Sequence, residues 1–250
     1  MLSDTIIAAP FQPAAPLRSL TVGPAQTAAP SDGDLGRRLF KIRTANSGGH
    51  RTSANILVDR MYTWRGYDTS GAAGAGSEDA SRVTLVAVDH DQTIGTISIR
   101  FDSANGLLVD DLFAQEVRAL RLAGRTVCEF TKLAVDGFVR SKRVLASLFH
   151  VAYICAHRLR GCDDLLIEVN PRHVRFYEQM LGLTIHGAER LNRRVNAPAV
   201  LMRLELAHAH EEIARFGGRA KDESTERSLY RYFFSVAEEA GIVGRLQRGE

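Results

Sequence analysis

Three polar residues in the second half of the chain are candidates for a chemical role or for positioning the residues that have one. Glu129 interrupts the apolar run "VCEFTKLAVD", and burial in such a strand raises the pKa of a carboxyl group toward that of a general base. Tyr177 lies on a predicted helix after the strand-like segment 164–169. Asn170 and Pro171 join that strand and helix, which is the pattern of a helix N-cap. The sequence thus predicts a base at Glu129, with a paired structural carboxylate as the alternative, and leaves a core position as one interpretation of Tyr177.

The elements that carry these residues follow from the periodicity of apolar residues. Alternation of apolar and polar residues predicts strands, and apolar residues at helical spacing predict helices. The predicted strands are 37–45, both arms of a hairpin in 81–101, 127–136, 164–169 and 197–207, and the predicted helices are 52–67, 108–124, 141–161 and 171–181. This order predicts an α+β or α/β three-layer fold with a mixed central sheet and helices on both of its faces.

The two ends of the chain differ from this central part in composition. Residues 1–35 hold five of the seven prolines together with many alanines, so we expect a flexible arm that buries little apolar surface. Residues 36–206 form the predicted main domain, and residues 207–250 form a predicted helical extension. Within the extension, the segment 228–243 is apolar around most of a helix and therefore needs a surface to pack on.

Composition and charge disfavour several classes of protein. The net charge of +3 is mild and few aromatic residues stand among the arginine clusters, so nucleic acid is not an expected partner. Three cysteines in apolar or helical contexts argue against a secreted disulfide framework, and no apolar run approaches the roughly 18 residues of a membrane span. We therefore expect a cytoplasmic protein without an integral membrane segment. The side chains that could suggest a metal site are His150, Cys155, His157 and Cys162. They do not converge on one face of the predicted helix, so a metal site is not expected.

The order of the elements and two motifs resemble a known superfamily. The segment "NPRHVRFYEQMLGL", with Asn170, Tyr177 and Gly182, is similar to the penultimate strand and helix of the GCN5-related N-acyltransferases, and the likeness covers residues 37–206. The segment "CEFTKLAVD" resembles the Glu-x-Ser/Thr-Arg-Phe/Leu-x-Val strand of the acyl-homoserine-lactone synthases, with Lys132 in place of the arginine. Within the superfamily the chain most resembles their relatives, the bacterial long-chain N-acyl amino acid synthases. The resemblance implies that 36–206 is an N-acyltransferase domain.

The resemblance also implies roles for particular residues in the transfer of an acyl group from a thioester to an amine. Glu129 is the expected base, and Tyr177 is the expected acid for the leaving thiolate. Alternation along the strand predicts one face that carries Glu129, Thr131, Leu133 and Val135. The oxyanion is expected to bind backbone amides of this strand, those of Leu133, Ala134 and Val135.

The expected donor is an acyl-phosphopantetheine thioester, with no tightly bound cofactor. The phosphate-binding loop of the superfamily corresponds here to "RSKRVL", residues 140–145, which contains no glycine. This departure favours an acyl carrier protein over free coenzyme A as the bearer of the thioester. Asn170 is also a candidate pantetheine contact. A basic rim for the acidic carrier protein is predicted at Arg140, Lys142, Arg143, Arg172 and Arg175, with ordinary solvated charge as the alternative.

The leading hypothesis is therefore an enzyme that joins a fatty acyl group from acyl carrier protein to the α-amine of an amino acid. The alternatives are an acyl-homoserine-lactone synthase, a short-chain acetyltransferase that uses coenzyme A, and a non-catalytic module that binds acyl groups or carrier proteins. The sequence does not single out the arginine that holds the acceptor carboxylate. The oligomeric state also stays open, with a homodimer as one option.

Overall fold

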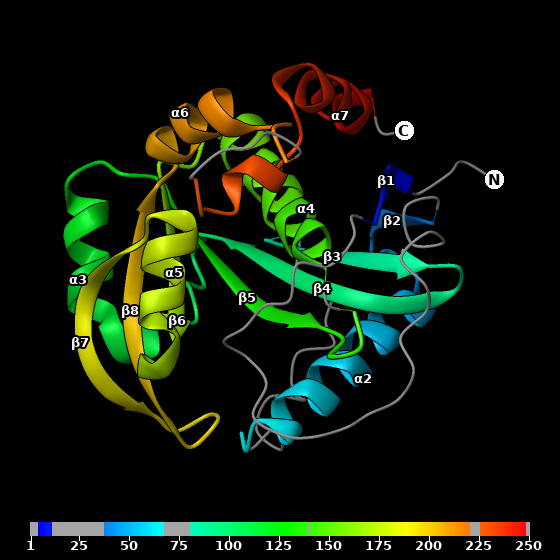
Figure 1. Ribbon diagram of the computed structural model, residues 1–250. Helices are drawn as coiled ribbons and strands as arrows, with labels where there is room; N and C mark the ends of the chain where they lie inside the picture. The colour runs from blue at the N-terminus through cyan, green and yellow to red at the C-terminus, as the bar shows by residue number, and fades with distance from the viewer. Residues whose placement is uncertain (1–4, 12–37, 68–80, 140, 221–225, 249–250) are drawn as a thin grey trace.

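One mixed sheet runs through the protein (Figure 1). The computed structural model describes residues 5–11, 38–67, 81–139, 141–220 and 226–248. The strands are β1 (Thr5–Pro10), β2 (Leu39–Thr44), β3 (Arg82–Asp89), β4 (Gln92–Phe101), β5 (Val127–Val135), β6 (Asp164–Val169), β7 (Thr184–Asn192) and β8 (Ala197–Glu205). Their order across the sheet is β1-β2-β3-β4-β5-β6-β8-β7. Among these strands β5 and β6 form the one parallel pair. The predicted mixed sheet is confirmed.

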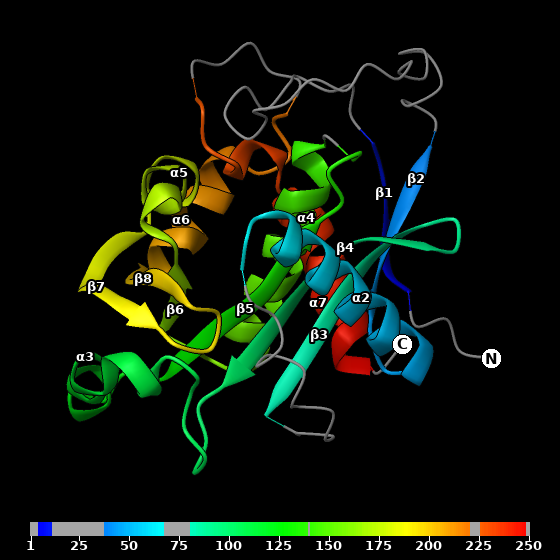
Figure 2. The same ribbon diagram turned by 90° about the horizontal axis from the view of Figure 1, so that it is seen from below.

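Helices cover both faces of the sheet, as the predicted three layers require. They are α2 (Gly48–Trp64), α3 (Asp110–Leu122), α4 (Lys142–Tyr153), α5 (Val174–Leu181), α6 (Leu206–Phe216) and α7 (Val236–Arg248). A π-helix, Ile154–Leu159, continues α4, so the two together confirm the predicted helix 141–161. In Figure 2, α2 lies in front of β3 and β4, and α7 lies behind them. No helix in the described part of the chain combines the length and the apolar character that crossing a membrane requires.

Strand alternation divides the core between the two faces. On β6, Leu165 and Ile167 join the main core with α4, α5, α6 and the C-terminal segments, whereas Leu166 joins a separate apolar cluster with α3. On β5, Val127 also packs with α3, while Ala134 packs with α2. The helices α2 and α3 therefore share one face of the sheet, and α4, α5, α6 and α7 share the other.

Two edge strands were absent from the predicted order. Residues 5–11 were expected to belong to a flexible arm, but β1 pairs with β2 and buries Ile6 and Phe11 in the main core, so this prediction is wrong for that part. The rest of the arm, as far as residue 37, lies outside the described residues. The strand β7 pairs with β8 although most of its side chains are exposed. Because β7 has few apolar residues, apolar alternation in the sequence does not predict it.

The predicted helix 228–243 is also wrong in its first half. A 3-10 turn at Tyr230–Tyr232 is followed by extended backbone at Phe233, and α7 begins only at Val236. The Arg143 guanidinium on α4 donates to the carbonyls of Tyr232 and Phe233. The Nδ1 atom of His150 accepts the amide proton of Phe234 at 2.9 Å. Because α4 satisfies these backbone groups, the segment needs no helical hydrogen bonds there. The tail and the main domain share one core, and the boundary at residue 206 stays a prediction.

Candidate active site

The parallel pair of strands opens into a fork. β5 and β6 pair at three positions, from Val127 to Glu129 on β5, although β5 continues to Val135 and β6 to Val169. Figure 1 shows the two strands diverging beyond the paired part. Within the described sheet, the backbone groups on this edge of β5 have no partner on β6, so they are available to a bound molecule. The amides predicted to bind the oxyanion belong to this part of β5.

A bulge in β5 changes the predicted orientation of its side chains. Lys132 has a φ of 51°, and at this point β5 contains one residue more than the facing stretch of β4. The bulge reverses the alternation, because Leu133 and Val135 pack against the main core while Ala134 turns to the α2 face. The prediction that Leu133 and Val135 share the face of Glu129 is therefore wrong.

Glu129 lies where the fork opens, on the face covered by α2 and α3. Its exposed fraction is 1%, and its Oε2 atom accepts a hydrogen bond from the amide of Leu108 at 2.7 Å. Burial raises the pKa of Glu129 to about 8, with a further rise from the charge of Glu168 and a smaller opposing effect from the Leu108 amide. The α-ammonium group of a free amino acid is a weaker acid than a chain terminus, whose pKa is about 8, so the raised pKa of Glu129 brings this base closer to the group that must lose a proton than an ordinary carboxyl would be. The half-buried Thr131 follows two residues later, ahead of the bulge.

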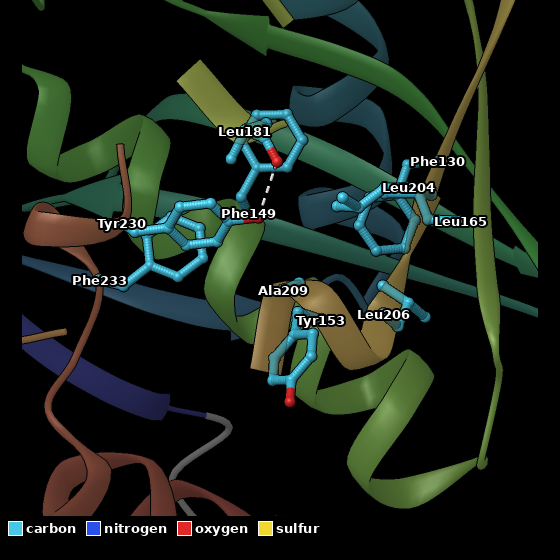
Figure 3. Close-up of a pocket in the computed structure, with 10 residues that line it drawn as sticks. All are labelled: Phe130, Phe149, Tyr153, Leu165, Leu181, Leu204, Leu206, Ala209, Tyr230 and Phe233. Carbon is cyan, nitrogen blue, oxygen red and sulfur yellow. Dashed lines mark hydrogen bonds between the residues drawn. The ribbon is translucent and has the colours of Figure 1, made fainter. Parts of the chain in front are cut away.

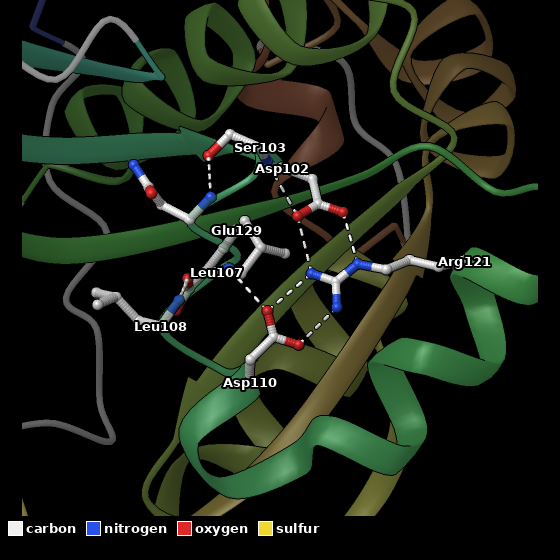
Figure 4. Close-up of polar contacts among 8 residues, drawn as sticks. Asp102, Ser103, Leu107, Leu108, Asp110, Arg121 and Glu129 are labelled. Carbon is white, nitrogen blue, oxygen red and sulfur yellow. Dashed lines mark hydrogen bonds and ion pairs between the residues drawn. The ribbon is translucent and has the colours of Figure 1, made fainter.

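A double ion pair holds the loop that contacts Glu129 (Figure 4). Arg121 on α3 makes two hydrogen bonds to Asp102, of 2.7 and 2.8 Å, and two to Asp110, also of 2.7 and 2.8 Å. Asp102 follows β4 and Asp110 begins α3, so the guanidinium ties both ends of the loop together. Bidentate pairs of this kind fix orientation as well as distance. The clamp therefore fixes the amide of Leu108 against Glu129.

A second carboxylate lies across the fork on β6, and the sequence-based prediction missed it. Both oxygens of Glu168 accept from Nη2 of Arg194, at 2.9 and 3.0 Å, and Oε2 also accepts from the amide group of Asn192. The Nη1 atom of Arg194 reaches Asp111 at 3.2 Å. Burial raises the pKa of Glu168 as well. The available signal was that Glu168 interrupts the apolar strand "DLLIEV", just as Glu129 interrupts its own.

Asn170 begins the helical segment after β6, and Tyr177 lies within that segment. The Oδ1 atom of Asn170 accepts from the amide of Arg172 at 3.2 Å, and Pro171 occupies the first turn, so the predicted N-cap is confirmed. Tyr177 packs edge-on against Phe149, and burial raises its pKa. Its hydroxyl has no hydrogen-bond partner among the described residues. Its role as an acid stays a prediction.

The residues of the predicted basic rim separate into two groups. Arg172 and Arg175 are exposed at the start of the helical segment after β6, and Lys142 is half-buried at the start of α4. Arg143 is 7% exposed and points inward to the C-terminal segment, so its assignment to an exposed rim is wrong. Arg140 lies outside the described residues. The part of the rim that the structure describes thus consists of three cations.

An apolar cavity of about 20 Å³ lies on the opposite face from Glu129 (Figure 3). It is lined by Phe130, Phe149, Tyr153, Leu165, Leu181, Leu204, Leu206, Ala209, Tyr230 and Phe233. Phe130 and Leu165 come from the two strands of the fork, and Tyr230 and Phe233 come from the C-terminal extension. The hydroxyl of Tyr230 donates to the carbonyl of Leu181 at 2.8 Å. The extension thus closes the cavity from outside.

The histidines of the α4 region have structural contacts. The Nε2 atom of His150 donates to Glu239 at 3.1 Å, and Nδ1 of His157 donates to the carbonyl of Cys162 at 2.8 Å. Within the described residues, no group of three or more His, Cys, Asp or Glu side chains is arranged to hold a metal ion.

Comparison with known proteins gives matches that span this site. The family model of the FeeM N-acyl amino acid synthases matches residues 53–205. The structure of FeeM, an N-acyl amino acid synthase from uncultured soil microbes, is 30% identical with a TM-score of 0.64, covering 70% of this chain and 94% of FeeM. The acyl-homoserine-lactone synthase LasI is 12% identical (TM-score 0.46), covering 67% of this chain and 89% of LasI. An N-acetyltransferase from Staphylococcus aureus Mu50 is 10% identical (TM-score 0.45), covering 66% and 98%. No curated protein matches the chain.

Proposed function

The chain belongs to the family of FeeM N-acyl amino acid synthases, and on that premise we propose that this acyltransferase moves a long-chain fatty acyl group from an acyl carrier protein to the α-amine of an amino acid. The observation that carries the proposal is the fork between β5 and β6. A buried carboxylate, Glu129, lies on one face of the fork, and an apolar cavity lies on the other. A thioester in the fork would extend its acyl chain into the apolar side and meet the amine on the charged side.

Glu129 serves as the base in this proposal. The acceptor enters as an ammonium ion, gives one proton to the Glu129 carboxylate, and attacks the thioester carbonyl as a free amine. Because the pKa of Glu129 is raised to about 8, the transfer from the ammonium group costs less than it would with an ordinary carboxylate. General-base catalysis of this kind contributes about a hundred- to ten-thousand-fold to the rate.

The remaining steps use the strand edge and Tyr177. The tetrahedral intermediate carries a negative oxygen, which the amides of Leu133, Ala134 and Val135 stabilise in this proposal. The carbon–sulfur bond then breaks, the attacking nitrogen gives up its second proton to water, and the thiolate takes a proton from water or from Tyr177, which water then reprotonates. Thr131 lies on the approach of the amine, next to Glu129 on the strand. The products are an N-acyl amino acid and the free thiol.

The acyl chain is assigned to the apolar cavity. A volume of about 20 Å³ holds little more than one water molecule, so a fatty chain fits only after neighbouring side chains move. Among the lining residues, Tyr230 and Phe233 are those that lie on the C-terminal extension beyond α6. We therefore assign the opening movement to this segment.

The carrier protein is assigned to the rim formed by Lys142, Arg172 and Arg175, with Arg140 two residues before Lys142 in sequence. Near the first turn of α4, the buried hydroxyl of Ser141 has no hydrogen-bond partner among the described residues. A helix N-terminus and a free hydroxyl suit the phosphate of phosphopantetheine. Asn170 keeps its proposed second role as a pantetheine contact. A cytoplasmic location is part of the same proposal, since all three cysteines are free and buried.

The function is tested by incubating the purified protein with long-chain acyl carrier protein and a panel of amino acids, followed by mass spectrometry. We expect N-acyl amino acids with the wild type and a loss of about a hundred- to ten-thousand-fold in rate with Glu129→Gln. The absence of any N-acyl product with the wild type would refute the catalytic proposal. A lactone product formed only with S-adenosylmethionine would identify a lactone synthase instead.

The donor is tested by charge reversal. Lys142→Glu and Arg175→Glu should raise KM for the acyl carrier protein about tenfold, while KM for the same acyl group on free pantetheine stays unchanged. Arg118→Glu is the matched control, because Arg118 is an exposed arginine on α3 at the other face. Equal KM values for the carrier protein in all three variants would rule out docking at this rim.

A further inference from the structure

The charged side of the fork contains a set of side chains that proton transfer alone does not require. Glu168 follows Leu166 by two residues, and Leu166 is the register partner of Glu129 on the neighbouring strand. Two residues correspond to about 7 Å along a strand, and both carboxylates face the α3 side of the sheet. The charge of Glu168 is close enough to raise the pKa of Glu129. The two carboxylates thus border one site.

Arg194 adds a cation to this site in a fixed orientation. The buried Asn192 donates to Glu168 and accepts from the backbone amide of Arg194 at 2.9 Å, so it fixes both partners. The Nη2 atom of Arg194 contacts both Glu168 oxygens. Its Nη1 atom instead reaches Asp111, whose side chain is 66% exposed, at the longer distance of 3.2 Å. One edge of the guanidinium is therefore anchored, and the other has a partner that a ligand can displace.

We propose that Arg194, Glu168 and Asn192 form the binding site for the acceptor amino acid, in which the guanidinium of Arg194 binds the α-carboxylate and the carboxylate of Glu168 binds the α-ammonium group. The assignment rests on the proposed function, because it deepens the acceptor half of that reaction.

The geometry matches the chemistry of a free amino acid. Its ammonium and carboxylate groups are separated by one carbon atom, and Glu168 and Arg194 are likewise adjacent and opposite in charge. The incoming carboxylate replaces Asp111 on Nη1 and forms the charge-assisted pair that arginine favours. The ammonium group then lies at Glu168, beside Glu129, where its proton can be removed. A simple amine offers no carboxylate to Arg194, so the site selects amino acids over amines.

The test compares amino acids with their decarboxylated amines as acceptors: phenylalanine with phenethylamine, and leucine with isoamylamine. In Arg194→Gln, KM for the amino acids should rise about 10- to 100-fold, which corresponds to the loss of a hydrogen bond between charged groups. The preference for an amino acid over its amine should fall by the same factor, while KM for the acyl donor stays unchanged. Arg193→Gln, at the exposed neighbouring residue, should leave the preference as in the wild type. Glu168→Gln should weaken the binding of both amino acids and amines, because both carry the ammonium group.

The ratio of the rate with an amino acid to the rate with its amine separates a binding role of Arg194 from a structural role. A general loss of packing would lower both of these rates together and leave their ratio unchanged. An unchanged ratio in Arg194→Gln would overturn the assignment even if activity fell. Binding of phenylalanine, measured by calorimetry without a donor, distinguishes the two proposals. If the wild type binds phenylalanine through Arg194 but makes no product, the acceptor site stands and the proposed function fails. If it makes N-acyl product and Arg194→Gln binds phenylalanine equally well, the acceptor site fails alone.

Discussion

Replacing Glu129 by glutamine should stabilise the protein at alkaline pH while it removes the proposed catalytic base. Glutamine keeps the size of the side chain and an oxygen that accepts from the Leu108 amide. It has no carboxyl proton to lose, so the variant avoids the cost of a charge at a position that is 1% exposed. Stability and activity should therefore change in opposite directions.

The magnitude follows from the pKa of Glu129. The folded state raises it from 4.5 to about 8, which corresponds to about 5 kcal/mol as an upper value. Because the folded-state pKa lies above the unfolded one, the favourable contribution is fully present below pH 4.5 and is lost as the pH rises through about 8. The unfolding free energy of the wild type, relative to Glu129→Gln, should thus fall by several kcal/mol from pH 5 to pH 9.

Urea unfolding followed by circular dichroism at pH 5, 7 and 9 measures this difference. Glu178→Gln is the control, because it makes the same chemical change at a carboxylate that is exposed on α5. Wild-type kcat/KM should rise with pH through about 8 as the base ionises, and Glu129→Gln should lack this rise. A stability difference between wild type and Glu129→Gln that stays constant within about 1 kcal/mol from pH 5 to 9 would refute the raised pKa.

Three further substitutions test other parts of the site. Tyr177→Phe should lower kcat less than about tenfold, since a thiol with a pKa of about 8.5 leaves readily without an acid; a larger loss in steady-state assays would make Tyr177 essential. Arg121→Gln should lower the unfolding free energy, measured in urea, by about 1–3 kcal/mol, because the loop that presents Leu108 to Glu129 loses its two ion pairs. It should also lower kcat, since Glu129 is then held less firmly. A normal kcat in this variant would contradict the link between the loop and activity. Ala209→Phe should fill the cavity and lower kcat/KM for long acyl donors much more than for butyryl donors; an equal effect on all chain lengths would place the acyl chain elsewhere.

Local pattern was sufficient for the elements that carry the candidate site. The alternation of "VCEFTKLAVD" predicted β5, and Asn170 with Pro171 predicted the cap of the segment after β6. These predictions succeeded because the forces involved act between residues close in sequence, as a hydrogen bond from residue 172 to residue 170 does. Glu129 was found in the same way, since a carboxylate in an apolar strand is visible without knowledge of its neighbours.

The tertiary structure decided what depends on distant neighbours. The bulge at Lys132 arises from the register with β4, and it turned Leu133 away from the predicted face. Arg143 resembles any exposed cation in sequence, but it is buried against carbonyls about ninety residues away. Glu168 and Arg194 are twenty-six positions apart, and only the turn between β7 and β8 brings them together.

Apolar periodicity was thus sufficient to predict the order of most elements, the mixed sheet and the buried carboxylate at position 129 that we propose as the base. The tertiary structure decided which face each side chain joined, which cations stayed exposed and where a second carboxylate stood. The physical reason is that apolar periodicity and capping are local properties of the chain, whereas burial, pKa and ion pairing depend on the complete set of packed neighbours.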